Sequence, residues 1–485
     1  MNEQQPEPTR IEADLLGMRE IPAEAYWGVH TLRARENFRI AGETVGDTPG
    51  LVAAIAAVKE AAAEANMELG LLDRRVGQAI SAACRDLRSG LFGDQFPIPL
   101  IQGGAGTSTN MNANEVIANR ALEHLGEAKG SYRVVSPNEH VNLGQSTNDV
   151  YPTALKVATI SNLRSLIGGL EKLQTSCETK AREFDHIVKM GRTQLQDAVP
   201  MTLGQEFRSF AVTIGEDIAR LTEAITHLHE INLGATAIGT GLNTHPVFAS
   251  IVREKLEHIT GLPVKTSPDL VEATQDCGVF VLISASVKRA AIKLSKISND
   301  LRLLSSGPRA GLAEISLPAR QAGSSIMPGK VNPVIPELVN QVAFEIMGAD
   351  VTVSLAAEAG QLQLNAFEPV IAASLFRSIE HLRVAATTLA DECIDGITAN
   401  EETLGQHVAQ SIGVVTALSP YLGYEVSGEI AATALRTGTP VVELVRQRNL
   451  MDPELLGRLL RPEIIAGGGE LPHLTLPPTL SPREL

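Results

Sequence analysis

The sequence predicts a mainly α-helical protein with a bundle of long helices at its centre. Two observations support this prediction: apolar residues recur every three or four positions over long stretches, and aromatic residues make up only 4% of the chain. The spacing places apolar side chains along one stripe of each helix. A core of Leu, Ile, Val and Ala with few aromatic rings suits an elongated bundle. Few strands are apparent.

Four long helices are expected in this bundle. The first covers residues 155–173, and the second begins at Phe207 and continues to about residue 228. A third extends from Asp269 to Gly307, and a fourth from Pro336 to about Gly360. The stripe of the second helix consists of Phe207, Phe210, Ile214, Ile218, Leu221, Ile225 and Leu228.

Three domains are expected along the chain. Residues 1–145 form an N-terminal, mostly helical domain that is interrupted by polar loops, and residues 146–396 form the central long-helix bundle. Residues 397–485 form a small C-terminal helical domain that ends in the proline-rich segment LPHLTLPPTLSPREL. This last segment is not expected to pack against the rest of the chain.

Charge and composition exclude several classes of function. A formal net charge of -15 opposes binding to nucleic acid or to an anionic membrane surface. The most apolar run, GVFVLISASV, is too short to span a bilayer, and the N-terminal residues do not resemble a secretory signal. We therefore expect a cytoplasmic protein. Its four cysteines have no CxxC spacing, so they are expected to be reduced, buried thiols.

Small polar residues are concentrated in four segments where loops meet helix starts. These segments are GGAGTSTNMN, GQSTND, GRTQLQD and GSSIMPGKVNP. Backbone N–H groups at helix N-termini, helped by Ser, Thr and Asn side chains, bind carboxylates well. The four segments together therefore indicate a site for a small dicarboxylate. For any one segment alone, the alternative is that these residues are helix caps and turn residues.

Other kinds of site fit the sequence less well. Five residues separate Gly323 from the Gly329–Lys330 pair, and Val331 follows, so the last segment is not a phosphate-binding P-loop. His227 and His229 would face different sides of a helix, which disfavours a metal pair. Neither a Ser-His-Asp order nor an HExxH motif is present. Chemistry without a metal or an organic cofactor is the simplest remaining possibility.

The polar segments resemble a known family. GSSIMPGKVNP resembles the signature of the aspartase/fumarase superfamily, and GGAGTSTNMNANEV, QSTND and GRTQLQDAVPMTLGQEF follow in the order of its aspartase branch. The resemblance extends from about residue 11 to about residue 462. It implies a three-domain fold whose central helices assemble into the core of a homotetramer, with each active site shared by three subunits. It also implies that residues 323–333 form a loop that closes over the substrate, its glycines acting as hinges.

The resemblance also implies a reaction, the reversible loss of ammonia from L-aspartate to give fumarate. A base must remove a proton from the carbon beside the side-chain carboxylate, which leaves a dianionic aci-carboxylate that preorganised donors must stabilise. Ser324 matches the base. Its alkoxide would need stabilisation by backbone N–H groups and by Lys330.

The remaining matched residues would bind the substrate. Those expected at the side-chain carboxylate are Thr107, Ser146, Thr147 and Ser325, and those expected at the other carboxylate are Thr193, Lys330 and Asn332. Asn148 and Gln194 would face the amino group. No cofactor is expected to be required, and the residues do not bear on activation by Mg²⁺.

Gln194 distinguishes this sequence from many members of the superfamily. They have His at this position, paired with a glutamate that corresponds to Glu337. A malate hydroxyl needs a proton in order to leave, whereas an ammonium group is already protonated, so a neutral amide favours ammonia loss over water loss. A class II fumarase is the alternative enzyme. An inert helical scaffold is the alternative of another class, and it would predict a damaged site, whereas the matched residues are intact.

Overall fold

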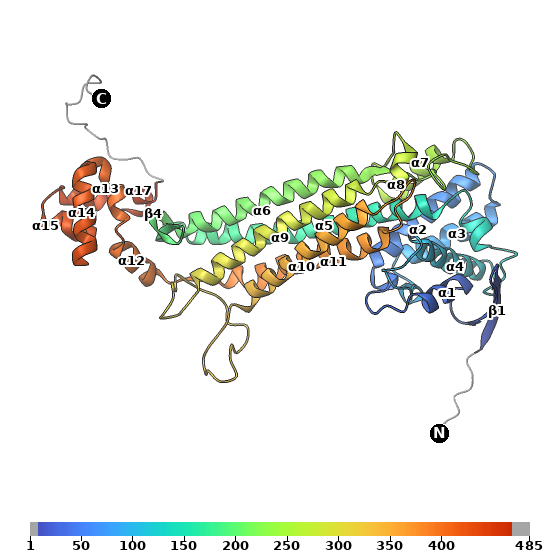
Figure 1. Cartoon of the computed structure of the whole chain (residues 1–485), viewed down its shortest axis with the longest axis horizontal. Coiled ribbons are helices and arrows are strands. Elements are labelled where there is room, and N and C mark those ends of the chain that lie inside the picture. Colours follow the sequence, from blue (N-terminus) through green and yellow to red (C-terminus); the bar gives the residue numbers. More distant parts are fainter. Residues whose placement is uncertain (1–7, 468–485) are drawn as a thin grey trace, which may run out of the picture. The chain divides into compact units, whose positions relative to one another are not determined.

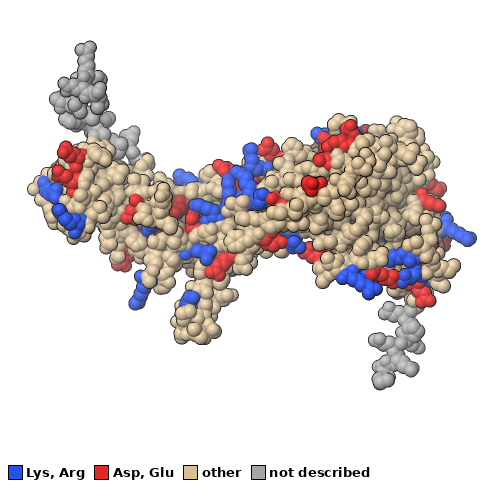
Figure 2. Space-filling view, in the orientation of Figure 1, with Lys and Arg blue, Asp and Glu red and all other residues tan. Residues whose placement is uncertain are grey.

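The computed structural model describes residues 8–467, and over this range the protein is mainly helical (Figure 1). The predicted fold class is thus confirmed. The proline-rich segment at the C-terminus lies outside the described residues. Within them, no helix is long and apolar enough to cross a membrane. On the face drawn in Figure 2, basic residues lie beside acidic ones along the helices.

Five helices in the described range have 23 or more residues. They are α5 (Thr147–Glu183), α6 (Leu203–Ile225), α9 (Gly278–Leu304), α10 (Val334–Glu358) and α11 (Glu368–Glu392). The predicted helices over 155–173 and 336–360 fall on α5 and α10. The helix predicted from Phe207 starts four residues earlier, at Leu203, and its last turn is a 3-10 helix, Thr226–His229. Helix α11 was not among the four helices predicted from the sequence.

The helix predicted from Asp269 to Gly307 is wrong as a single element. The chain forms a short α8 (Leu270–Gln275) and then α9, and Asp276 between them is extended, with φ -80° and ψ 130°. The Asp276 carboxylate accepts a hydrogen bond from the N–H of Gly278 at 2.9 Å. An aspartate that caps the next helix competes with continuation of the previous one, although the apolar spacing continues across the break.

The described chain forms two compact units. The first contains the chain up to Gly168 together with Asp217–Ala291 and Val342–Arg383, and the second contains Gly169–Glu216, Ile292–Gln341 and the chain from Val384 onward. The division into three domains at 145 and 396 remains a prediction.

The first unit contains the N-terminal elements. An antiparallel hairpin of β1 (Thr9–Asp14) and β2 (Gly17–Pro22) precedes α1 (Val29–Asn37), α2 (Pro49–Glu68), α3 (Arg74–Arg88) and α4 (Thr107–His124). A short π-helix follows at Pro137–Val141. The parallel pair β5 (Glu230–Ile231) and β6 (Lys265–Thr266) flanks α7 (Phe248–Thr260). Helix α2 is buried on nearly every side and packs against α3, α4 and α7.

The second unit contains two small antiparallel pairs and a set of short helices. The hairpin of β3 (Val188–Thr193) and β4 (Gln196–Thr202) and the pair β7 (Ile315–Ser316) with β8 (Thr398–Ala399) lie here. The short helices are α12 (Glu401–Gln410), α13 (Val414–Leu422), α14 (Tyr424–Thr437), α15 (Val441–Gln447), α16 (Pro453–Leu459) and α17 (Pro462–Ile465). Leu418, Ile430, Val441, Val445 and Leu456 form the centre of their core.

Candidate active site

The predicted residues of the first unit lie at the N-termini of two long helices. Thr107 is the first residue of α4, and Thr147 is the first residue of α5. Asn110, in the first turn of α4, donates a hydrogen bond to Thr147 Oγ1 at 3.1 Å. The two helix starts are therefore adjacent. Each presents backbone N–H groups and the positive end of its helix dipole, which is the environment that binds a carboxylate.

The turn before α4 depends on glycine. Gly104, Ala105 and Gly106 all have positive φ values, of 91°, 55° and 86°. A Cβ atom at Gly106 would lie 2.5 Å from Cγ of Tyr151, whose ring packs directly against the turn. The missing side chain thus lets the GGAGT turn contact α5 closely enough for Asn110 to reach Thr147.

The QSTND turn is held from beneath by Asp149. This carboxylate is fully buried and accepts N–H hydrogen bonds from Ser146 at 3.0 Å and, across the unit, from Gly234 at 3.1 Å and Thr236 at 2.9 Å. Burial raises the pKa of Asp149 to about 6, although the three N–H groups and nearby Lys59 act in the opposite direction. Asp149 thereby joins the start of α5 to the segment 232–237. Asp149 belongs to the QSTND motif, but the motif alone does not predict this supporting role.

Asn148 is oriented by the same segment. Its side-chain Nδ2 donates to the carbonyl of Ala237 at 2.7 Å, and its own carbonyl accepts from Asn232 at 2.9 Å. With its nitrogen engaged, Asn148 presents the side-chain oxygen Oδ1 as the atom that accepts from a ligand. An acceptor at this position suits an ammonium group.

In the second unit, Thr193 and Gln194 lie at the tip of the β3–β4 hairpin. Thr193 pairs with Gln196, so the turn consists of Gln194 and Leu195, whose φ values are 54° and 63°. Positive φ at both central residues is the type I′ arrangement, which normally favours Asn and Gly. Two larger residues in this conformation are strained, so the surrounding structure must hold the turn in place. Both side chains are exposed in the single chain.

A buried glutamate supports this hairpin. Glu314 is fully buried and forms ion pairs with two residues of β3, Lys189 at 2.9 Å and Arg192 at 2.6 Å. His407 of α12 lies 3.3 Å from the same carboxylate. Burial acts to raise the pKa of Glu314, but Lys189 and Arg192 outweigh it and hold the pKa below its ordinary value. The sequence contains no local signal for these contacts, because Glu314 and Lys189 are far apart in the chain.

Residues 323–333 form a loop that is closed on itself. The N–H of Gly323 donates to the carbonyl of Lys330 at 2.7 Å, and Asn332 Nδ2 donates to the carbonyl of Gly323 at 3.0 Å. A Cβ atom at Gly323 would lie 2.6 Å from the Lys330 carbonyl oxygen. Gly323 is therefore required for a close backbone contact at the base of the loop, while Gly329 has a φ of 80° at its tip.

Ser324 is the hydroxyl of this loop that lies among backbone donors. Its Oγ accepts from the N–H of Ile326 at 3.2 Å and from the N–H of Met327 at 3.0 Å. Lys330 and Asn332 line one cavity of about 830 Å³ together with Glu337. Ser325 is exposed on the loop. The second unit thus contains Thr193, Gln194, Ser324, Ser325, Lys330 and Asn332, while Thr107, Ser146, Thr147 and Asn148 belong to the first.

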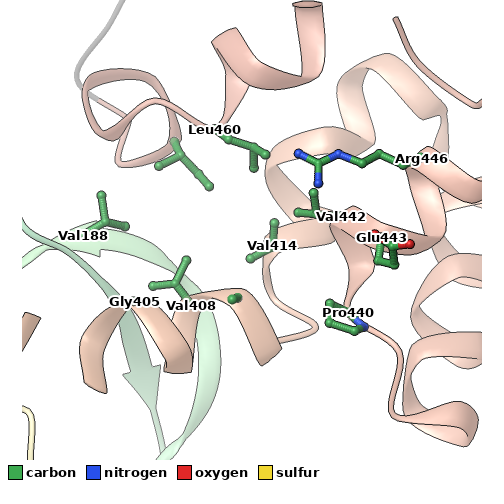
Figure 3. A pocket seen from close by; sticks show the side chains of 11 residues that line it. Val188, Gly405, Val408, Val414, Pro440, Val442, Glu443, Arg446 and Leu460 are labelled. Carbon is green, nitrogen blue, oxygen red and sulfur yellow. The ribbon is translucent and has the colours of Figure 1, made fainter. Parts of the chain in front are cut away.

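A separate apolar pocket of about 440 Å³ lies in the second unit (Figure 3). Val188, Val408, Val414, Val442 and Leu460 line it, and Glu443 and Arg446 of α15 lie at its edge. None of its lining residues comes from the four polar segments, so it is distinct from the candidate site. Within residues 8–467, no group of three His, Cys, Asp or Glu side chains is arranged to hold a metal ion.

Comparison with known proteins identifies the family. The family described as "Lyase" matches residues 17–348, and the family "Fumarase C C-terminus" matches residues 414–467. The chain belongs to the fumarase/aspartase superfamily. This assignment confirms the resemblance noted in the sequence.

Relatives within the superfamily include both enzymes and solved structures. The aspartate ammonia-lyase of Pseudomonas fluorescens is 56% identical over 94% of this chain and 95% of its own length. The crystal structure of a fumarate lyase:delta crystallin from Brucella melitensis bound to cobalt is 52% identical, with a TM-score of 0.92 over 95% of this chain and all of that one. A recombinant class II fumarase from Schistosoma mansoni is 34% identical, with a TM-score of 0.90 over 96% of this chain and 100% of that one.

The contact between Gly106 and Tyr151 leads to a test of stability. Gly106→Ala should lower the free energy of unfolding by about 1–3 kcal/mol more than Gly126→Ala, because overpacking adds to the cost of a positive φ. Gly126 is the matched control: its φ is 79° and a Cβ there meets nothing within 4 Å, whereas φ at Gly106 is 86°. Denaturant titration measures both values. Equal losses would mean that the Tyr151 ring moves aside without cost.

Proposed function

We propose that this protein is an aspartate ammonia-lyase, which converts L-aspartate reversibly to fumarate and ammonia. The observation that supports it most is that the bacterial aspartate ammonia-lyase is far more similar in sequence over nearly the whole chain than the class II fumarase is. The reaction is then that of a carbon–nitrogen lyase acting on a small dicarboxylate. Gln194 supports the same choice, because a neutral amide binds a departing amine without having to supply a proton.

Ser324 is the proposed base. A free serine hydroxyl is too weak an acid to ionise at neutral pH, so the site must stabilise the alkoxide. The two N–H groups that donate to Ser324 Oγ support this role, since they would donate to the alkoxide in the same geometry. The alkoxide takes the proton from the carbon beside the side-chain carboxylate. The electron pair left there delocalises into that carboxylate, which gives the aci-carboxylate intermediate, and it forms the C=C bond when the C–N bond breaks and ammonia leaves.

The first unit supplies the proposed seat for the carboxylate on which charge develops. Thr107, Ser146 and Thr147 lie at or beside the N-termini of α4 and α5, where N–H groups and hydroxyls face a developing negative charge. Asn148 would accept from the ammonium group with Oδ1. Ser325 of the loop would complete the seat when the loop closes over the substrate.

The second unit supplies the proposed contacts to the other carboxylate, through Thr193, Lys330 and Asn332. Lys330 and Asn332 line the same cavity, which supports a common ligand. We further propose that the reaction needs no cofactor, because the base and the donors named above account for each charge that develops.

The proposed assembly is a homotetramer in which three subunits contribute to each active site. An exposed apolar stripe on α10 supports association: Phe344, Val351 and Leu355 are 61%, 57% and 63% exposed and follow one side of the helix. Light scattering on the purified protein would measure the mass. A cytoplasmic location is proposed as well, and it is supported by the four cysteines, all of which are buried and unpaired.

A substrate panel tests the proposed reaction. We expect ammonia release and absorbance of fumarate at about 240 nm with L-aspartate, and little turnover of D-aspartate, L-asparagine, L-malate or argininosuccinate. The proposed site would require an amine and two free carboxylates, in the arrangement that the L configuration gives them. Preference for L-malate would identify a class II fumarase. No turnover of any compound would identify an inert scaffold.

Ser324→Ala tests the base. Turnover should fall to background while the tetramer and its thermal unfolding midpoint are retained, because the hydroxyl contacts only the N–H groups of its own loop. Loss of assembly in the variant would instead assign Ser324 a structural role. Ser209→Ala is a suitable control, since Ser209 is exposed on α6 and its hydroxyl donates to the Glu206 carbonyl at 2.7 Å, away from the loop.

Variants at Gln194 test whether this residue contacts the amino group of the substrate. Gln194→Ala should lower kcat/KM for aspartate roughly 10- to 150-fold, which corresponds to one hydrogen bond to a charged group of about 1.5–3 kcal/mol. Gln194→His should retain appreciable ammonia-lyase activity and add a group that titrates at about pH 6.5 to the pH–rate profile. Unchanged aspartate kinetics in Gln194→Ala would show that the residue does not contact the amine.

A further inference from the structure

A fully buried lysine is connected to Thr147 through two asparagines. Lys59 of α2 has no exposed surface, and its Nζ donates to Asn142 Oδ1 at 2.8 Å. The same oxygen accepts from Asn110 Nδ2 of α4 at 3.2 Å. Asn110 Nδ2 also donates to Thr147 Oγ1 at 3.1 Å. These four residues, Lys59, Asn142, Asn110 and Thr147, form a continuous hydrogen-bonded chain from the interior of the first unit to the start of α5.

The direction of every hydrogen bond in this chain is determined. Asn142 Nδ2 donates to the backbone carbonyl of Gln145 at 3.2 Å, and a carbonyl can only accept. Asn142 must therefore turn Oδ1 toward Lys59 and Asn110. Asn110 in turn must present Nδ2, and the two hydrogens of this nitrogen go to Asn142 and to Thr147.

The consequence for Thr147 concerns its own proton. Because Asn110 donates to Oγ1, the inner side of the hydroxyl is an acceptor, and its hydrogen is directed elsewhere. Thr147 is half-buried at the N-terminus of α5, so the hydroxyl can donate outward to a ligand. A carboxylate only accepts, so a hydroxyl held as a donor is already in the orientation that a carboxylate needs.

Packing alone does not account for a lysine at this position. Burial of a lysine ammonium costs free energy unless the group is hydrogen-bonded or paired. An apolar side chain of similar length would fill the same space on the alanine-rich α2 without that cost. Asp149, which holds the other side of the QSTND turn, is close enough to Lys59 to raise its pKa, although burial has the larger effect and lowers the pKa to about 7. Lys59 is thus linked to both groups that hold the QSTND turn: Asp149 on one side, and Asn142 with Asn110 on the other.

We propose that Lys59, Asn142 and Asn110 are positioning residues that hold the Thr147 hydroxyl as a hydrogen-bond donor toward the substrate's side-chain carboxylate. This inference rests on the proposed function, which places Thr147 at that carboxylate. None of the three residues needs to touch the substrate. Their effect is to remove the alternative orientation of Thr147, in which its proton points inward and its lone pairs face the carboxylate.

A double-mutant cycle tests whether Lys59 acts through Thr147. Thr147→Val should lower kcat/KM for L-aspartate by at least about 10-fold, the loss expected for one hydrogen bond to a charged group. Lys59→Met should lower it by a similar or smaller factor, and the double variant should be little worse than Thr147→Val alone, because residues in one network are not additive. Additive losses would overturn the inference. Asn110→Ala replaces Lys59→Met in the cycle, with the same expected and contrary outcomes, if the lysine variant does not fold.

A matched control separates positioning from general loss of stability. Lys156 is also buried in the first unit, at 7% exposure, and its Nζ donates to the Glu230 carbonyl at 2.8 Å, outside the chain of four residues. Lys156→Met should lower the unfolding midpoint as Lys59→Met does, but it should leave KM and kcat for L-aspartate unchanged. Equal kinetic losses in the two lysine variants would mean that burial of any lysine matters, and would overturn the positioning role.

A pair of variants at Asn110 tests the direction of the hydrogen bond from Asn110 to Thr147. Asn110→Asp keeps the shape of the side chain but replaces the donor with an acceptor, so Thr147 would turn its proton inward. We expect Asn110→Asp to bind succinate, a dicarboxylate with no amino group to eliminate, at least as weakly as Asn110→Ala, measured by calorimetry. If Asn110→Ala is the weaker binder, Asn110 serves packing and the inference is wrong.

If Thr147→Val leaves aspartate kinetics unchanged while the wild type still releases ammonia, the assignment of Thr147 fails but the proposed reaction stands.

Discussion

Two buried carboxylates hold the polar turns of this protein, one in each unit. Asp149 fastens the QSTND turn to the segment 232–237, and Glu314 fastens β3 through Lys189 and Arg192. Because neither carboxylate is exposed, each must be satisfied entirely by protein groups. The turns above them present small polar side chains at the surface of their unit. A rigid support beneath an accessible donor is the arrangement that anion binding requires, since donors that must first reorient contribute little.

The support from Glu314 also explains how the turn at Gln194 and Leu195 can keep an unfavourable backbone conformation. Gln194 and Leu195 adopt positive φ values, which cost about 1–2 kcal/mol per non-glycine residue. Such conformations persist only where the surrounding structure determines them. The two ion pairs of Glu314 fix the strand that leads into the turn, and Ser411 donates to Asp197 at 2.7 Å on the strand that leaves it. The hairpin tip is thus defined from both sides, and glycine, which would tolerate the geometry, would lose the side chain at position 194.

Much of the helical fold and the polar segments could be predicted from the sequence, because both leave local signals. Apolar spacing locates α5, α6 and α10, and clusters of Ser, Thr and Asn at helix starts locate Thr107 and Thr147. A helix start is the wrong prediction for GRTQLQD, which forms the β3–β4 turn, and Ser324 lies in the loop that precedes α10. The break at Asp276 could not be predicted in this way, because the apolar spacing continues across it. Lys59 illustrates the deeper limit. Within an alanine-rich helix it resembles a solvated lysine, and its partner Asn142 is 83 residues away in the chain, so only tertiary packing reveals that it is buried.

The structural and chemical interpretations of the polar segments need not compete. Ser324 Oγ accepts hydrogen bonds from two backbone N–H groups within its own loop, as a turn-forming serine does. A hydrogen bond to a neutral hydroxyl contributes about 0.5–1.5 kcal/mol, whereas one to a charged group contributes about 1.5–3 kcal/mol. The same two N–H groups would therefore stabilise an alkoxide more than they stabilise the resting hydroxyl. A contact that is stronger in the reacting state than in the ground state is the kind that accelerates a reaction, so the turn that shapes the loop also supplies part of the chemistry proposed for it.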